Sequence, residues 1–202
     1  MHILVMGVRH RTAPIEVRER FALLEEEVRP ALECLKAMPG VEECAILTTC
    51  NRTEIYTVVR DTELGHEAIL RFYREFKGFD VTPYHRYRFT LMHEDAVMHL
   101  FRVASGMDSL ILGEGQILGQ VKETLAAAQR NKTAGTVLDK LFKAAISAGK
   151  RVRTETGISE KLVVAGSAQK CVISDFTADE IASTAAVHKI HARLKGELTG
   201  FV

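Results

Sequence analysis

A thiol, an amide and a guanidinium follow one another in this sequence at Cys50, Asn51 and Arg52. The apolar run before them ends in two threonines, and apolar alternation resumes at Ile55, so we expect a strand, a tight polar loop and a second strand. A nearby guanidinium favours the thiolate, which is the reactive form of cysteine, and presents a planar fork that suits a carboxylate. In the alternative interpretation, Cys50 is a small buried hydrophobe and Arg52 is a solvated turn residue.

The segment from Gly106 to Gln120 has a composition that suits a binding wall. Its glycines allow the backbone to approach a ligand closely, and Gln116 and Gln120 lie four residues apart on one face of a helix that should begin near Glu114. The alternative is a glycine-rich connector with a capping Ser109.

His99 is a further candidate, a histidine that precedes the Gly106 to Gln120 segment in the sequence. It falls on a helix expected from His93 to Ala104, at the border of the apolar stripe, where an imidazole either points into a cleft or caps the core. The eight histidines include no HExxH and the four cysteines no CxxC pair, so neither a metal site nor a disulfide is expected.

Apolar periodicity predicts strands and helices in the first half of the chain and helices alone in the second. We therefore expect an α+β fold, in which a strand and helix domain has a helical subdomain that leads into a helical C-terminal tail. The expected elements are strand Met1 to Val8, a short helix from Pro14, a helix ending before Pro39, strands Val41 to Leu47 and Thr53 to Val59, helix Leu64 to Phe76, a strand at Tyr84 to Phe89, helices carrying stripes from Ala96, Ile117 and Val137, and a tail helix from Ala178 to Leu198.

Composition is ordinary for a globular protein: 202 residues, 47% hydrophobic, can form one large domain or one domain with an appendage. No apolar run of about 18 residues and no signal peptide is visible, so we expect a cytoplasmic protein without membrane contact.

Two segments could bind nucleic acid, although the net charge of the chain is only +1. Arg130 to Arg153 carries seven basic residues against one acid, which is +6 and leaves −5 for the remainder. Tyr84 to Phe89 interleaves basic and aromatic residues. A solvated helix face and a half-buried edge strand are the respective alternatives.

The run Thr49-Cys50-Asn51-Arg52-Thr53-Glu54 resembles the active-site signature of the glutamyl-tRNA reductase family. A second similar run, Gly106 to Ile117, follows at the appropriate distance, and the resemblance extends from Met1 to about Ala168. It implies that Cys50 attacks the ester carbonyl of glutamyl-tRNA to form a thioester, which NADPH reduces to glutamate-1-semialdehyde for tetrapyrrole biosynthesis.

The same resemblance implies roles for the neighbouring residues. Arg52 would hold the substrate carboxylate, and His99 would polarise the carbonyl or assist proton transfer near the thiol. The remaining glutamate-recognition positions would be Thr49, Asn51, Ser109, Glu114, Gly115, Gln116 and Gln120.

Beyond about Ala168 the chain departs from the family pattern, because Gln169 to Val202 has no GxGxxG and no second βαβ unit. We expect a catalytic domain over residues 1–158 and an atypical tail over 159–202 in place of the NADPH-binding domain. NADPH, a homodimer and contact with the next pathway enzyme are expected of the family, but no cofactor motif or dimerisation domain is recognisable. The alternatives are a non-catalytic tRNA- or protein-binding module and a thiol-dependent esterase.

Overall fold

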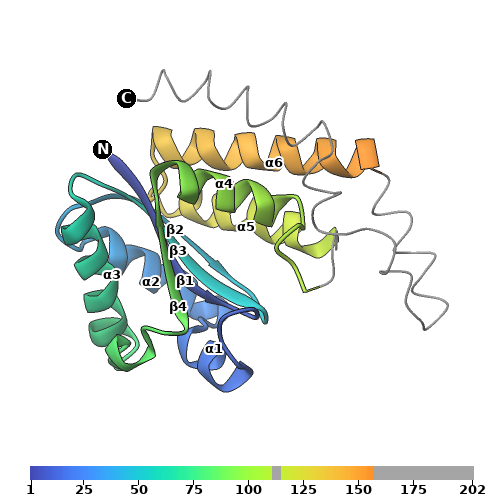
Figure 1. Ribbon diagram of the computed structural model, residues 1–202. Helices are drawn as coiled ribbons and strands as arrows, with labels where there is room; N and C mark the ends of the chain where they lie inside the picture. Colours follow the sequence, from blue (N-terminus) through green and yellow to red (C-terminus); the bar gives the residue numbers. More distant parts are fainter. Residues whose placement is uncertain (111–114, 157–202) are drawn as a thin grey trace. The chain divides into compact units, whose positions relative to one another are not determined.

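Four antiparallel strands form a single sheet in the order β2-β3-β1-β4, so β3 and β1 are central and β2 and β4 are its edges (Figure 1). The computed structural model describes residues 1–110 and 115–156. The strands are β1 (His2–Arg9), β2 (Val41–Thr48), β3 (Arg52–Val59) and β4 (Arg88–Met92).

Helices cover both faces of the sheet within the compact unit Met1–Gly149 (Figure 1). The helices α1 to α3 pack on one face and α4 to α6 on the other. Their bounds are α1 (Ile15–Phe21), α2 (Glu25–Lys36), α3 (Thr62–Phe76), α4 (His93–Ala104), α5 (Gly115–Arg130) and α6 (Thr136–Thr156), with a short 3-10 helix at Thr82–Tyr84. The expected α+β fold is confirmed.

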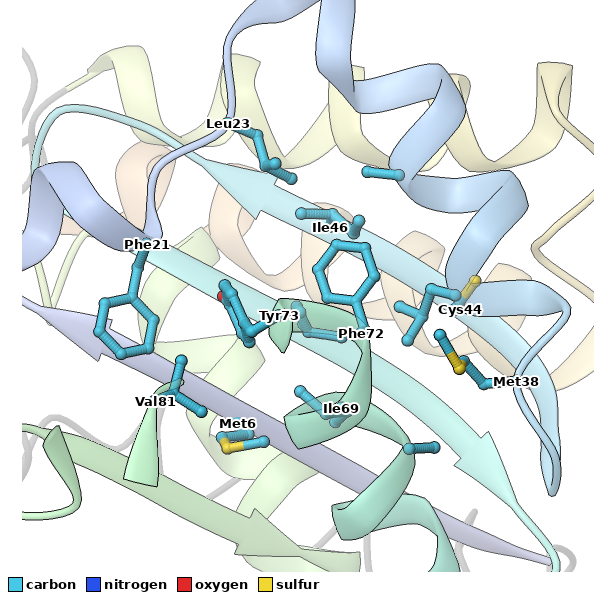
Figure 2. Packing of buried hydrophobic residues seen from close by; sticks show 14 of the residues in the cluster. Met6, Phe21, Leu23, Met38, Cys44, Ile46, Ile69, Phe72, Tyr73 and Val81 are labelled. Carbon is cyan, nitrogen blue, oxygen red and sulfur yellow. The ribbon is translucent and has the colours of Figure 1, made fainter. Parts of the chain in front are cut away.

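Alternation along the strands sends one set of side chains to each face. Met6, Ile46 and Ile55 face α1 to α3 and pack with the aromatic rings of Phe72 and Tyr73, as Figure 2 shows for part of this cluster. All eight residues of β3 are buried, so its polar side chains have no access to bulk water. Those side chains must find their partners inside the protein.

Among residues 1–110 and 115–156, the predicted strands and helices are confirmed within a few residues at their ends, except around Tyr84 to Phe89. That segment was predicted to be a strand, but the chain forms a 3-10 helix at Thr82–Tyr84 and β4 begins only at Arg88. Asp80 explains the difference, because its carboxylate accepts from the N–H and the hydroxyl of Thr82 and turns the chain there.

The aromatic residues of this segment serve packing in the structure. Tyr84 meets Phe21 and Phe79 in edge-to-face contacts, and its hydroxyl accepts from Arg20. Phe89 packs against His99 at 4.9 Å between ring centroids. These contacts give Tyr84 and Phe89 a packing role in the fold.

Several expectations lie outside the described residues: Glu114, the boundary at residue 158, and the tail with its helix from Ala178 to Leu198. None of the helices in the described part has the length and hydropathy needed to cross a membrane.

Two helix glycines differ in the space around them, and replacing each by alanine tests the packing at that position. A Cβ at Gly149 of α6 would overlap the carbonyl oxygen of Ala104, whereas one at Gly119 of α5 meets open space. We expect Gly149→Ala to destabilise the fold by about 1–3 kcal/mol through overpacking. Gly119→Ala should stabilise it by about 0.5–1 kcal/mol, since alanine has the higher helix propensity. Urea unfolding measures both, and equal effects would contradict the close α4–α6 contact.

Candidate functional site

The loop between β2 and β3 consists of Thr49, Cys50 and Asn51, and its own first residue holds it in shape. The Thr49 N–H donates to the carbonyl of Arg52 at 2.8 Å, and the Thr49 hydroxyl accepts from the N–H groups of Asn51 and Arg52 at 3.2 and 3.1 Å. From the end of β1, the His10 N–H donates to the carbonyl of Asn51 at 2.9 Å. The loop is therefore fixed from both sides.

Cys50 is exposed at the tip of this loop, and the two other cysteines in the described part of the chain differ from it in burial. Cys34 is half-buried, and burial raises the pKa of its thiol. Cys44 is fully buried beneath α2, where burial raises its pKa to about 12. Cys50 is the most exposed of these three free thiols.

Arg52 follows the loop directly and is only 1% exposed, because it lies on the buried face of β3 that meets α4 to α6. Its Nη1 donates to Glu54 Oε1 at 2.8 Å and to Asp108 Oδ2 at 3.1 Å, and its Nη2 donates to the Asp108 backbone carbonyl. The guanidinium thus joins strand β3 to the turn that follows α4.

Glu54 completes this buried network on the strand side. Its Oε1 contacts His99 Nε2 at 3.0 Å, and its Oε2 accepts from the Tyr56 hydroxyl at 2.6 Å. Burial opposes ionisation of Glu54, but His99, Arg52 and Tyr56 outweigh it and lower the pKa of this carboxyl to about 2. For Tyr56, burial and then the Glu54 carboxylate raise the pKa well above its ordinary value.

Asp108 is the acid on the other side of Arg52. Both of its oxygens also accept from Arg9 Nη1 at 3.0 Å. Burial opposes its ionisation, but Arg52 and Arg9 more than compensate and lower its pKa. Gly106 positions it: with φ of 76° it ends α4 in a left-handed turn that leads the chain back beneath β3.

A small pocket of about 30 Å³ opens beside Cys50. Its walls combine the β2–β3 loop, the turn after α4 and the first two turns of α5. The lining residues are Thr49, Cys50, Asn51, Arg52, Ser109, Gln116, Ile117 and Gln120. The structure thus brings together seven of the ten residues singled out from the sequence.

The other three residues are not part of this lining. His99 is buried behind Glu54, Gly115 begins α5 without lining the pocket, and Glu114 lies outside the described residues.

The pocket presents unused hydrogen-bonding capacity. Ser109 Oγ is buried and has no partner among the described residues. Arg52 uses both N–H groups of Nη1 and one of Nη2, so its Nε and the second Nη2 hydrogen have no partner in the described part of the chain. A buried hydroxyl such as that of Ser109 requires a hydrogen-bond partner, which water or a polar ligand can provide.

Sequence reasoning missed four residues of the network: Arg9, Glu54, Tyr56 and Asp108. A signal was present for two of them, since Glu54 and Tyr56 alternate with Arg52 on one face of a strand between apolar positions. Arg9 and Asp108 are 99 residues apart and carry no such local signal.

A group of three possible metal ligands lies in this network: atoms of Glu54, His99 and Asp108 are within 4.8 Å of one another. The arrangement does not fit a metal ion, because the Arg52 guanidinium already lies between the two carboxylates and bonds to both. The network is organised around a side-chain cation.

Fold and pocket together define an α+β domain that presents an exposed cysteine on a hairpin loop, at the mouth of a small polar pocket. Residues 6–156 match the family model described as "Glutamyl-tRNAGlu reductase, N-terminal domain". The chain therefore belongs to the glutamyl-tRNA reductase family, of which it contains the N-terminal domain.

Individual relatives agree with this assignment. The chain is 52% identical over 168 residues to glutamyl-tRNA reductase of Crocosphaera subtropica, covering 83% of this chain and 39% of that protein. Identity is 50% over the same coverage for the enzyme of a Synechocystis species. Glutamyl-tRNA reductase from Methanopyrus kandleri has a similar structure, with a TM-score of 0.59 and 32% identity over 76% of this chain and 34% of that one. The chain spans about 39% of the length of its curated relatives.

Differential thiol labelling tests the placement of Cys50. At neutral pH we expect iodoacetamide to modify Cys50 much faster than Cys34 or Cys44, since burial raises the pKa of both of the latter thiols. Peptide mapping of the briefly labelled protein identifies the site. Preferential labelling of Cys34 or Cys44 would contradict the exposed loop.

The buried carboxylate should also control acid stability. The pKa of Glu54 is depressed, so its ionised form contributes stability above the ordinary value of 4.5 that is lost as the pH falls towards about 2. Glu54→Gln should cost about 3–5 kcal/mol at pH 6 by leaving Arg52 short of a partner. It should also flatten the loss of stability between pH 4.5 and 2.5 relative to the unchanged protein.

Tyr56→Phe serves as a milder variant, expected to cost about 1–3 kcal/mol through one lost bond to a charged group. The control is Glu26→Gln at an exposed position, for which we expect a change within about 0.5 kcal/mol. Chemical denaturation across this pH range gives all three values. An unchanged pH profile in Glu54→Gln would show that the carboxylate does not contribute to acid stability.

Proposed function

We propose that this domain forms the covalent thioester of a glutamyl-tRNA reductase, with Cys50 as the nucleophile and the glutamyl ester of tRNA as the substrate. The observation that carries the proposal is an exposed thiol at a pocket whose wall holds a buried arginine, some of whose donors have no partner among the described residues. The family match over residues 6–156 supports a catalytic domain that ends near residue 158.

The proposed step converts the oxygen ester of glutamyl-tRNA into a thioester at Cys50. The Cys50 thiolate attacks the ester carbonyl, a carbon–sulfur bond forms, and the carbon–oxygen bond to the terminal ribose breaks. The ribose oxygen leaves and takes up the proton that the thiol lost. Water then hydrolyses the thioester to free glutamate and restores the thiol, unless a hydride donor reduces it first.

Arg52 supports recognition of the glutamate carboxylate through the edge of its guanidinium that has no partner in the described part of the chain. Nε and Nη2 lie on the same side of the guanidinium, and such a pair suits a bidentate carboxylate. Because Glu54 and Asp108 bind the other donors, this edge is held in a fixed orientation. Ser109 Oγ and the side chains of Gln116 and Gln120 supply further polar contacts around the same small volume.

His99 supports the reaction as a positioning residue in this proposal. Its ring is buried, contacts Glu54 through Nε2 and packs on Phe89, and it is not part of the pocket lining. We infer that it acts by holding Glu54, and through Glu54 the orientation of Arg52, rather than by touching the substrate.

NADPH, which the family implies, does not fit the described residues. Dinucleotides bind where a parallel strand runs through a glycine-rich turn into a helix, and all strand pairs here are antiparallel. No described strand leads through such a turn into a helix. We therefore derive no reduction step from these residues.

Hydrolysis of glutamyl-tRNA tests the proposal directly. The chain should release glutamate at a rate that NADPH does not change, and Cys50→Ser should reduce the rate at least a hundredfold, because a serine hydroxyl is a far weaker nucleophile at neutral pH. Radiolabelled glutamate released from the tRNA gives the rate. Arg52 is a poor choice for this test, since its substitution also disturbs the buried network.

A matched control separates chemistry from folding. Cys34→Ser removes a thiol outside the pocket and should leave hydrolysis unchanged. Equal rates for Cys50→Ser and the unchanged chain would reject the proposal. Tight tRNA binding without any cleavage would favour the non-catalytic binding module instead.

A further inference from the structure

A groove of about 810 Å³ runs along the outer edge of the sheet, between α2 and α5. Its floor includes Ile46 and Thr48 of the edge strand β2, and its walls are the facing sides of the two helices. All of its lining residues belong to the unit Met1–Gly149. Gln120 is the one lining residue of this groove that the proposed reaction at Cys50 uses.

The groove adjoins the Cys50 pocket. Gln120 of α5 lines both spaces, and Thr48 of the groove precedes Thr49 of the pocket. A molecule that places its reacting carbon at Cys50 can therefore extend along β2 without crossing the core.

Three cations line the groove: Arg29, Arg130 and Lys132. Arg29 pairs with Glu33 and Arg130 with Glu123, but all four side chains are more than half exposed, and such pairs contribute little. A phosphate can therefore compete for these arginines. Lys132 has no ion-pair partner among the described residues, so its ammonium is available outright.

The backbone at Lys132 is unusual for a lysine. Its φ is 56°, in the left-handed region, where it ends α5 with bonds from the Lys132 N–H to Gln129 and from the Thr133 N–H to Ala128. Glycine is the residue normally found at this position of a helix end, because a Cβ is disfavoured there. The lysine thus occupies this position at a backbone cost, and we infer that its side chain has a use there.

The edge strand adds hydrogen-bonding groups to the floor. The Cys44 N–H on this edge donates to the carbonyl of Thr133, so the loop after α5 covers the strand there. By the alternation of an antiparallel ladder, the Ile46 N–H and carbonyl face the same side, and they have no partner among the described residues. The groove therefore offers both cations and backbone hydrogen bonds to an occupant.

We propose that this groove receives the 3′-terminal nucleotides of the tRNA whose glutamyl group lies at Cys50, an inference that rests on the proposed function. The ester joins the glutamyl group to the terminal ribose, so the nucleic acid must begin next to the Cys50 pocket and leave through a space that adjoins it. The phosphates meet Lys132, Arg130 and Arg29, while the aliphatic side chains of the lining contact sugars and bases.

Acidic and basic residues are equally numerous in the lining, which suits a short single-stranded end better than a duplex. The basic residues of α6 do not line the groove, so the predicted basic stretch from Arg130 to Arg153 contributes only its first part to this surface.

Lys132→Gly provides the decisive variant, because it removes the ammonium while suiting the left-handed backbone. Its melting temperature should be unchanged or higher. Its matched control is Lys122→Ala within α5, which removes an equal charge from a position outside the groove. The full 202-residue chain is used throughout.

Two substrates are compared: glutamyl-tRNA and the p-nitrophenyl α-ester of glutamate, which has no nucleotide. We expect Lys132→Gly to weaken binding of uncharged glutamate-specific tRNA about two- to fivefold relative to Lys122→Ala, and to lower kcat/KM for glutamyl-tRNA by the same factor. The small ester should be cleaved equally by both variants. Combining Lys132→Gly with Arg29→Gln and Arg130→Gln should enlarge the loss and reduce the salt dependence of binding.

The outcomes separate this inference from the proposed function. If both substrates are cleaved through Cys50 and Lys132→Gly matches Lys122→Ala on glutamyl-tRNA, the groove does not hold the tRNA end, and an extended peptide along β2 becomes the better occupant. If the unchanged chain cleaves neither substrate, the proposed function fails, and the comparison of tRNA binding still decides the groove.

Discussion

A buried cluster of charges joins the central strand β3 to the turn after α4, and the geometry of the site depends on it. Arg52, Glu54 and Asp108 are each at most 2% exposed, so all three have lost their hydration. Such groups are tolerable only when they satisfy one another, because removing one leaves an uncompensated charge in the interior. The cluster therefore fixes the end of the hairpin that bears Cys50 against the helical face of the domain.

This arrangement gives Arg52 two simultaneous uses. Most of its donors bind Glu54 and Asp108, and the remaining edge of the guanidinium lines the pocket. A cation held by two fixed acids loses little orientational freedom on meeting a ligand, which is the general advantage of preorganisation. His99, Tyr56 and Arg9 extend the network outward and hold the two acids in turn.

Much of the site could be predicted from residue types and order. The hairpin around Cys50 and the helix carrying Gln116 and Gln120 were both foreseen, because turn residues and apolar periodicity are local signals. The strand expected at Tyr84 to Phe89 was wrong, since the Asp80 side chain outweighed β-propensity there. Arg52 was expected in the polar loop, with a solvated turn residue as the alternative. The structure places it buried at the start of β3, because whether a strand residue faces water depends on the helices that cover it.

The sequence by itself determined the fold class, the order of the elements and the loop that displays Cys50, because each follows from contacts between residues close in the chain. Only the tertiary structure decided what surrounds that loop. Arg9 meets Asp108 across 99 positions and Arg52 meets it across 56, and no local pattern encodes such a pairing. The groove beside β2 likewise exists because α2 and α5, far apart in sequence, pack on opposite faces of the same edge strand.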